Sequence, residues 1–228
     1  MSKPPSGRRK ESALSRERIV AEAVALLDEG GEPGLTFRAL ADRLATGAGA
    51  LYWHIDDKRD LLIAACDAII ASAVDTPASK ATPETRIRTI AGRLFDAMDA
   101  HPWIGGALTQ AGGTLPAVRI LESLGQQVQA LGVPQKQQWS TTSALMSYIT
   151  GVGGENAARS QLARRHGFDR SRLLTEVSQT WAALDAQAFP FARQVAARLP
   201  THDDRADFLA GIDLILRGIS ASAQRHRR

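Results

Sequence analysis

Side chains able to bind a phosphate backbone gather in the segment Leu51–Leu62, which reads Leu-Tyr-Trp-His-Ile-Asp-Asp-Lys-Arg-Asp-Leu-Leu. The Tyr52 hydroxyl and the His54 ring can donate hydrogen bonds to phosphate oxygens. Lys58 lies where a new helix is expected to begin, so its charge would add to the main-chain amides of that helix terminus. Such contacts position a protein on a nucleic acid but carry no sequence preference.

Tyr52 and Trp53 have a second interpretation, as aromatic residues that close the core of a small helical domain. This is the commoner role of an aromatic pair. If both lie on one helix, however, they point about 100 degrees apart, and one small core cannot bury both. We therefore expect at least one of them to be exposed.

Contacts to base edges are expected from few residues. Arg38, in the first turn of a predicted helix, can form a bidentate pair with guanine, and the alternative is an arginine that only faces solvent. Thr36 and Thr46 can bond phosphate or serve only as helix caps. The following helix begins with small residues that lack polar side chains: Gly47, Ala48, Gly49 and Ala50. Their methyl groups can contact thymine, and the glycines allow close approach of the backbone.

The elements that must hold these residues are helices, because apolar residues recur at spacings of three and four and alternating strand patterns are absent. The first helix is expected from a cap at Ser15 to a stop at Gly30 and Gly31. Thr36 caps a second, a third covers 48–54, and Asp57 caps a fourth. Further helices are expected at 83–100, 103–110, 116–131, 135–164, 171–186, 190–199 and 203–224.

Two short helices joined by a tight turn, with Ala41 at their close approach, have the spacing of a helix-turn-helix. With Leu35-Thr36-Phe37-Arg38-Ala39-Leu40-Ala41 and the segment Leu51–Leu62, residues 15–70 closely resemble the TetR family of bacterial transcriptional regulators. The resemblance implies that Tyr52, His54 and Lys58 contact the DNA backbone and that Trp53 lies close to it. Beyond Pro83 only the general plan of the family is similar, a helical ligand-binding and dimerisation domain.

The expected fold is therefore all-α and has three parts. Residues 1–14 form a basic flexible arm, 15–76 a three-helix DNA-binding domain with its linking helix, and 83–228 the effector-binding and dimerisation domain. The boundary is placed in the proline-containing segment 77–83. The arm can enter a minor groove, add affinity for phosphates or have no role.

Small residues in two of the later helices predict close packing against other helices in a homodimer. The interface residues proposed from this pattern are Ser147, Gly151, Gly154, Gly211, Ile215, Gly218 and Ser222. Packing inside one subunit would explain either set alone. A two-fold dimer fits a palindromic operator, because two recognition helices must meet successive major grooves about 34 Å apart.

An effector pocket is expected within 83–228, with apolar walls and a few polar anchors. The candidate lining residues are Met98, His101, Trp103, Leu124, Trp139, Thr142, Met146, Tyr148, Ile149, Asn156 and Trp181. For each of them, ordinary core packing is the alternative. Together they predict a small, fairly hydrophobic effector of no prescribed charge.

Composition and motifs argue against other classes of protein. The chain has 228 residues, 44% hydrophobic and 23% charged, with a net charge of +4, as expected of a folded globular protein. Its single cysteine and dispersed histidines predict no metal site, and no nucleophile or nucleotide-loop motif occurs, so we expect neither catalysis nor a cofactor. No signal peptide or membrane-spanning segment is expected, which favours the cytoplasm.

The leading hypothesis is a ligand-responsive repressor, a homodimer that binds a palindromic double-stranded DNA operator until a small hydrophobic effector releases it. The first alternative is a helical small-molecule-binding protein with little sequence-specific DNA reading. A further alternative is an auxiliary protein that acts through protein contacts.

Overall fold

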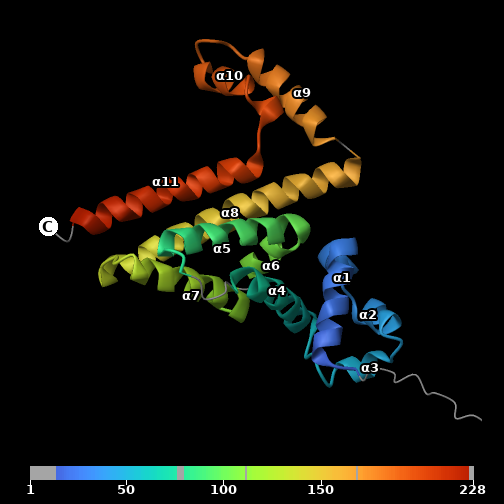
Figure 1. Ribbon diagram of the computed structural model, residues 1–228. Coiled ribbons are helices and arrows are strands. Elements are labelled where there is room, and N and C mark those ends of the chain that lie inside the picture. The colour runs from blue at the N-terminus through green and yellow to red at the C-terminus, as the bar shows by residue number, and fades with distance from the viewer. Residues whose placement is uncertain (1–13, 76–79, 111, 168, 226–228) are drawn as a thin grey trace, which may run out of the picture. The chain divides into compact units, whose positions relative to one another are not determined.

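The computed structural model describes residues 14–75, 80–110, 112–167 and 169–225, and every regular element within these ranges is a helix (Figure 1). The all-α fold predicted from the apolar spacing is confirmed. Except for Leu14, the arm predicted at residues 1–14 lies outside the described residues. None of the helices in the described ranges is both long enough and apolar enough to cross a membrane.

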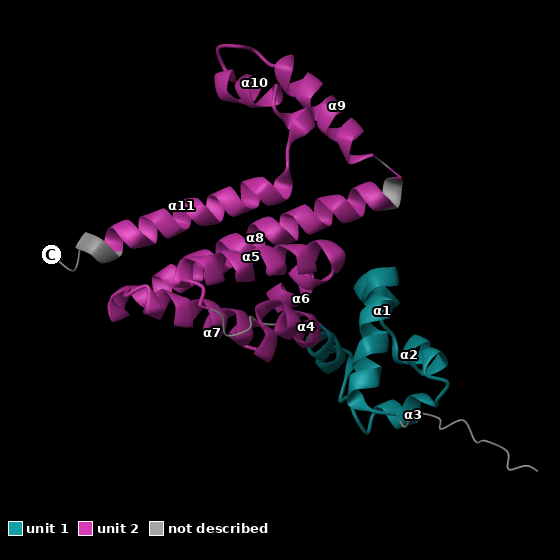
Figure 2. Cartoon of the chain, viewed as in Figure 1, with its two compact units in different colours: residues 1–65 teal, residues 66–228 magenta. Residues whose placement is uncertain are grey.

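The chain divides into two compact units, residues 1–65 (unit 1) and 66–228 (unit 2) (Figure 2). The division falls inside helix α4 (Lys58–Val74), whereas the sequence boundary at 77–83 assigns this whole helix to the DNA-binding domain. The second half of α4 packs within unit 2. There Asp67 accepts two hydrogen bonds from Arg119, at 2.6 and 3.2 Å, which tie α4 to α7 (Leu115–Ala130).

Unit 1 contains α1 (Arg16–Gly34), α2 (Phe37–Arg43), α3 (Ala48–Leu51) and the start of α4. The predicted caps are confirmed: Ser15 accepts a hydrogen bond from the Arg18 amide, Thr36 from the Ala39 amide, and Asp57 from the Asp60 amide. Gly31 interrupts α1 with a φ of 63°, the left-handed conformation that glycine adopts without strain. The helix-turn-helix thus begins after the break that the sequence predicts.

One apolar core holds these helices together, and its residues are Ile19, Ala23, Leu26, Leu27, Leu35, Leu40, Ala41, Leu44, Leu51, Ile55, Leu61, Leu62 and Ala65. An ion pair fixes α2 to α1 from outside, because Arg43 donates two hydrogen bonds to Glu29, at 2.8 and 2.9 Å. These bonds lower the pKa of the Glu29 carboxyl. The geometry of the helix-turn-helix is therefore set by core packing and by a charged clamp.

Helix α3 is shorter than the predicted range 48–54. It ends at Leu51, whose carbonyl accepts hydrogen bonds from the amides of His54 and Ile55 at 2.9 and 3.0 Å. The bond from His54 spans three residues, which tightens the chain into a turn. Gly49 also weakens the helix, because glycine is a poor helix former. Tyr52 and Trp53 consequently lie in the turn after α3, and the prediction that they are helical is wrong.

Unit 2 contains α5 (Pro83–Ala100), α6 (Ile104–Gln110), α7, α8 (Gln135–His166), α9 (Arg170–Ala182), α10 (Pro190–Ala196), a 3-10 turn η1 (Leu199–Thr201) and α11 (Asp204–Arg225). Most bounds lie within two residues of the prediction. The helix predicted at 190–199 is split into α10 and η1. Pro200 has no N–H to donate to the Ala196 carbonyl, so α10 cannot continue through it.

The core of unit 2 lies between α5, α7, α8 and α11, and the long helices α8 and α11 run beside each other (Figure 1). Phe208 of α11 stacks on Phe95 of α5 and on Tyr148 of α8, with ring centroids 4.7 and 5.6 Å apart. A Cβ added at Gly153 would lie 2.3 Å from the Met98 side chain. Glycine at this position therefore lets α5 approach α8 closely.

Candidate nucleic-acid interface and ligand pocket

The turn after α3 presents two aromatic side chains on the surface of unit 1. Trp53 is 89% exposed and Tyr52 is 58% exposed. Tyr52 is fixed by stacking on Phe37 of α2, with ring centroids 4.7 Å apart and planes 7° apart. The expectation that at least one aromatic is exposed is confirmed, and the interpretation of both as core residues is wrong.

Two cations of unit 1, Arg38 and Lys58, differ in whether they have a hydrogen-bond partner. Arg38 is exposed and makes no hydrogen bond or ion pair with any described residue. The Lys58 ammonium donates a hydrogen bond to the Glu32 carbonyl at 2.8 Å, which holds it at the start of α4. Arg43, by contrast, is engaged by Glu22 and Glu29 and presents no free charge.

The start of α3 is open. Ala48 and Gly49 are exposed, Ala50 is half-buried, and a Cβ added at Gly49 would meet no atom within 4 Å. Nothing in unit 1 therefore hinders close approach of a ligand to this backbone. His54 is half-buried, and its carbonyl accepts a hydrogen bond from Arg16.

Thr36 and Thr46 differ in role. The Thr36 hydroxyl caps α2, so its predicted capping role is confirmed. Thr46 is half-buried, and its amide donates to the Ala41 carbonyl at 3.0 Å. The preceding residue, Ala45, has a φ of 50°, a left-handed conformation that an alanine rarely adopts. The sequence held no signal for it, because glycine or asparagine usually marks such a position.

The residues predicted to line an effector pocket do not surround one cavity in unit 2. Met98, Trp103, Leu124, Thr142 and Ile149 are buried in its core. Trp139 and Trp181 are 71% and 37% exposed, so neither is an enclosed wall. The residues His101, Met146 and Tyr148 are half-buried. Burial of the Tyr148 hydroxyl raises its pKa, and the hydroxyl donates to the Phe208 carbonyl at 3.2 Å.

His101 lines a separate pocket of about 390 Å³, and Asn156 lines a larger recess. The recess has two adjoining parts of about 620 and 270 Å³, a size typical of small-molecule sites. Both parts are lined by Asn156, Ser160, Arg164, Arg170 and Asp204. The larger part adds Phe95, Asp96, Asp99, Ala100, His202, Asp203 and Arg205, and the smaller adds Arg159, Ala163, Leu173 and Leu174. We call it the polar recess, since charged side chains dominate a pocket that was expected to be hydrophobic.

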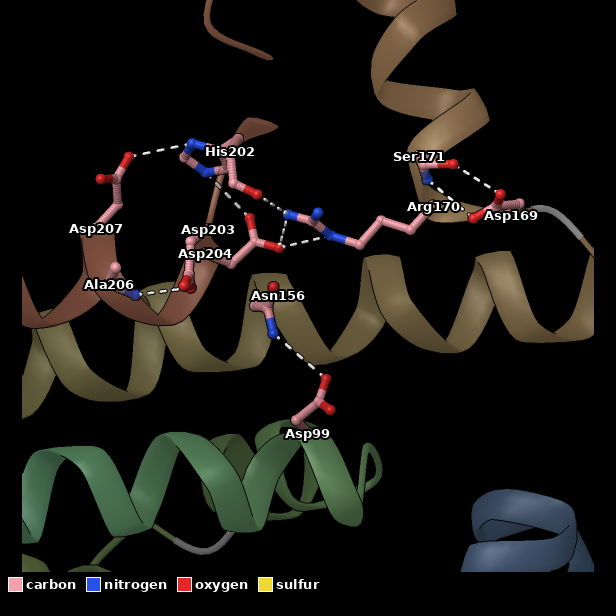
Figure 3. Close-up of polar contacts among 10 residues, drawn as sticks. All are labelled: Asp99, Asn156, Asp169, Arg170, Ser171, His202, Asp203, Asp204, Ala206 and Asp207. Carbon is pink, nitrogen blue, oxygen red and sulfur yellow. Dashed lines mark hydrogen bonds and ion pairs between the residues drawn. The ribbon is translucent and has the colours of Figure 1, made fainter. Parts of the chain in front are cut away.

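A network of hydrogen bonds forms one wall of the polar recess (Figure 3). Asp204 accepts a hydrogen bond from Arg170 at 2.9 Å and lies 3.1 Å from a ring nitrogen of His202. The other ring nitrogen of His202 lies 3.1 Å from Asp207. This network connects the start of α9 to the start of α11. Elsewhere in the lining Asn156, only 7% exposed, donates to the Asp99 carboxylate at 3.3 Å.

Sequence reasoning missed most of this recess. Arg170 and Asp204 are far apart in the chain, on helices whose apolar pattern gives no sign that their N-termini meet. A clue was available in α8, where Arg159 and Ser160 follow Asn156 by three and four residues and therefore lie on the same face of the helix. Among the described residues, no group of three or more histidines, cysteines and carboxylates is arranged to hold a metal ion.

The residues predicted at a dimer interface fall into two groups. Ser147, Gly151 and Gly218 are exposed, while Ile215 and Ser222 are half-buried. Gly154 and Gly211 contact helices of their own subunit. Gly154 lies against Gly105 of α6, and a Cβ added at Gly211 would lie 1.8 Å from the Tyr148 hydroxyl. Packing within the subunit accounts for these two glycines.

Two family models match consecutive parts of the chain. Residues 19–65 match the model for bacterial regulatory proteins of the tetR family, and residues 76–223 match the model for the tetracyclin repressor-like C-terminal domain. The first match covers the helix-turn-helix with its exposed aromatics. The second covers the polar recess and the long helices α8 and α11.

Individual proteins agree with the family models. A tetracycline repressor protein of class A from Escherichia coli is 32% identical over 76% of this chain and 81% of its own length. A TetR transcriptional regulator from Streptomyces coelicolor is 51% identical, covers 92% of this chain and 100% of its own, and superposes with a TM-score of 0.84. BioQ, solved with its double-stranded DNA operator, is 28% identical over 68% of this chain and 93% of its own, with a TM-score of 0.57. The chain therefore belongs to the TetR family of bacterial regulatory proteins and is a DNA-binding regulator of transcription.

Proposed function

We propose that this protein is a cytoplasmic repressor that binds a palindromic operator as a homodimer and leaves it when a small molecule occupies unit 2. The observation that carries the proposal is the exposed group formed by Arg38, Tyr52, Trp53 and Lys58, which we call the DNA-facing group. Trp53 is 89% exposed on a folded unit, so it has no packing role there.

The residues of the DNA-facing group and the adjacent, half-buried His54 divide by chemistry. The Tyr52 hydroxyl, the His54 ring and the Lys58 ammonium bind phosphates, with Trp53 packed against the sugar-phosphate backbone. Arg38, whose guanidinium has no partner among the described residues, pairs with guanine in the major groove. Two further sets have smaller roles: Thr36 and Thr46 at phosphates, and Ala48, Gly49 and Ala50 at thymine methyl groups or in close backbone approach.

The homodimer forms through the outer faces of α8 and α11. Ala144, Ser147 and Gly151 are exposed on α8, and Gly218 is exposed on α11. Leu214 of α11 is 63% exposed, although it is a large apolar side chain. A partner subunit that covers these residues would bury Leu214 and let helices approach closely at the glycines.

The effector part of the proposal is supported by two observations. The chain is similar to a tetracycline repressor protein over most of its length, and unit 2 contains a recess large enough for a small molecule. Helix α4 begins in unit 1 and is tied to α7 of unit 2 by Asp67 and Arg119. A ligand that moves the helices of unit 2 can therefore act on the DNA-binding unit through one continuous helix.

Selection of bound fragments from a random double-stranded DNA library, at one stated salt concentration, tests the DNA-binding part. We expect enrichment of an inverted repeat whose half-sites are spaced by about one turn of the double helix. A variant with Trp53→Ala and Lys58→Ala provides the control and should enrich nothing. If the wild-type protein also enriches nothing, the alternative of a helical small-molecule-binding protein replaces the repressor.

Binding of one compound with and without operator tests the regulatory part. A compound found by thermal-shift screening should bind more weakly to the operator complex, by a coupling of about 1 to 3 kcal/mol, because linkage between two sites is reciprocal. Isothermal titration of both forms measures this difference. If the compound binds the free protein and the operator complex with equal affinity, it is not an inducer, and the proposal that the protein binds DNA still stands.

A further inference from the structure

The smaller part of the polar recess contains two arginines without an anionic partner. Arg159 makes no hydrogen bond or ion pair with any described residue. Arg164 donates one hydrogen bond, at 3.1 Å, to the main-chain carbonyl of Asp99, so its remaining N–H groups and its charge are not neutralised there. A guanidinium is shaped to hold a carboxylate or a phosphate with two parallel hydrogen bonds.

Two of the acids near these arginines are already paired with cations. Asp204, the acid that both parts of the recess share, is paired with Arg170 and His202. Asp96 of the larger part is held by two hydrogen bonds from Arg205, at 2.7 and 2.9 Å, which raise the pKa of that arginine. The charge left in the smaller part is therefore positive.

Asp99, which has no cation partner among the described residues, lies in the larger part of the recess. Its carboxylate accepts a hydrogen bond from the buried Asn156 at 3.3 Å (Figure 3). The smaller part of the recess therefore offers positive charge, whereas the larger part offers the Asp99 carboxylate as a hydrogen-bond acceptor. A ligand that extends through both parts would need an anionic group at one end and can place a hydroxyl or amide donor at the other.

The smaller part also has an apolar wall. Leu173 and Leu174 of α9, with Ala163 of α8, line it beside the arginines. Leu173 is 40% exposed, so its apolar surface gains from being covered. A fully hydrated inorganic anion would leave this wall exposed to water, whereas an organic acid would cover it.

We propose that the polar recess binds an amphipathic organic anion. Its carboxylate pairs with Arg159 and Arg164, and its apolar body lies against Leu173 and Leu174. The inference rests on the proposed function, since this anion would be the effector. It differs from the hydrophobic effector expected from the sequence, because the charge of the ligand is specified by the arginines.

The test compares 2-naphthoate with 2-naphthamide, a neutral molecule of nearly the same shape, by isothermal titration of the full-length protein. We expect naphthoate to bind about tenfold more tightly or better, since hydrogen bonds between a guanidinium and a carboxylate are stronger than those to a neutral amide. Inorganic phosphate, the third probe, should bind more weakly than naphthoate. Equal binding of acid and amide, phosphate binding as tight as naphthoate, or no binding of naphthoate at millimolar concentration would each overturn the proposal.

Variants locate the binding. Arg164→Gln should weaken naphthoate about tenfold and leave the amide unchanged, and Leu174→Ser should weaken both. Arg172→Gln is the matched control, because Arg172 lies on α9, pairs with Glu176 and lines neither part of the recess. Naphthoate affinity that falls equally in Arg172→Gln and Arg164→Gln would place the anion elsewhere. Circular dichroism verifies that each variant is folded.

Operator binding in the same samples separates this inference from the proposed function. If naphthoate binds through Arg164 but does not weaken operator binding, the anion site stands and its role as the effector site is wrong. If operator binding is intact and no anion binds, the regulator stands and the anion site is wrong. The operator is the sequence obtained from the DNA selection.

Discussion

At the scale of single residues, Arg38 and Lys58 are two exposed cations with different surroundings. Arg38 is free of partners among the described residues, whereas Lys58 is held by the Glu32 carbonyl at the start of α4. We expect Arg38→Ala to cost about 1 to 3 kcal/mol at the operator and to relax the base preference at one position in each half-site. Lys58→Ala should weaken binding to all sequences alike and reduce the dependence of affinity on salt.

Fluorescence anisotropy with the operator and with single-base variants, repeated over a range of salt concentrations, distinguishes the two roles. Arg59→Ala is the control for a general loss of positive charge, because Arg59 is also exposed and follows Lys58 directly. A base preference unchanged by Arg38→Ala would show that Arg38 does not contact a base.

Cys66 is the single thiol of the chain, and it is fully buried in α4. Burial, with a smaller contribution from the Asp67 charge, raises the pKa of the thiol to about 12. Between its ordinary pKa of 9.0 and this value, the unfolded chain loses a proton that the folded chain keeps. The contribution of Cys66 to stability is thus complete below the ordinary value and is lost as the pH rises through this interval.

The buried thiol should also be unreactive near neutral pH, because the thiolate is the nucleophile and is both scarce and covered. We expect no reaction with an aromatic disulfide reagent in the native protein and one equivalent after denaturation in guanidinium chloride. The absorbance of the released thiolate measures this. Reaction of the native protein at the rate of a free cysteine would contradict the assigned burial.

At the scale of the elements, the contact of α8 with α11 depends on Gly211. A Cβ there would lie 1.8 Å from the Tyr148 hydroxyl, which is fixed by its bond to the Phe208 carbonyl and by stacking on Phe208. Gly211→Ala should gain about 1 kcal/mol in helix propensity but lose about 1 to 3 kcal/mol through overpacking. We expect the loss to be the larger, because two contacts hold the tyrosine in place.

Thermal unfolding followed by circular dichroism measures the effect, about 2 to 4 °C in Tm for each kcal/mol in a chain of this size. Gly106→Ala in α6 is the matched control, because a Cβ there meets no atom within 4 Å and the helix gains stability. If Gly211→Ala melts at or above the temperature of Gly106→Ala, Tyr148 moves aside without loss of stability, and the steric argument is wrong.

Most helices could be predicted from the sequence because their signals are local. Apolar residues at helical spacing and caps such as Ser15, Thr36 and Asp57 place helix ends to within a few residues. Helix α3 was overestimated, since the spacing of Tyr52 and Trp53 suits a helix as well as the turn that follows it. The turn there is closed by hydrogen bonds from the His54 and Ile55 amides to the Leu51 carbonyl, which leave no mark in the sequence.

The two candidate sites differ in how far the sequence could predict them. The DNA-facing group lies within residues 38–58, and its side chains are charged or too closely spaced to be buried together in one small core. Its exposure could therefore be predicted from neighbouring residues alone. The polar recess joins α5, α8, α9 and α11, and the pairing of Arg170 with Asp204 in its wall depends on tertiary packing. Leu124 and Ile149, which were predicted to line a pocket, are core residues, and residue type alone could not distinguish the two roles.

At the scale of the whole molecule, the division into two units separates the DNA-facing group from the polar recess. Each unit has its own core, and α4 belongs to both. A dimer through unit 2 would let each subunit offer one DNA-facing group to the operator. The symmetry of the operator is then a consequence of the two-fold axis of the protein.

Substitution of two exposed glycines tests this assembly. A Cβ added at Gly151 or at Gly218 meets no atom of its own subunit within 4 Å, so Gly151→Leu and Gly218→Leu should leave the subunit folded. A leucine at either position would hold the helices of two subunits apart, because small residues are needed where helices approach closely. We expect wild type to sediment as a dimer at micromolar concentration and both variants to shift toward the monomer. Gly106→Leu, on a helix outside the proposed interface, should remain dimeric. A monomeric wild type, or variants that remain dimeric, would show that α8 and α11 do not form the interface.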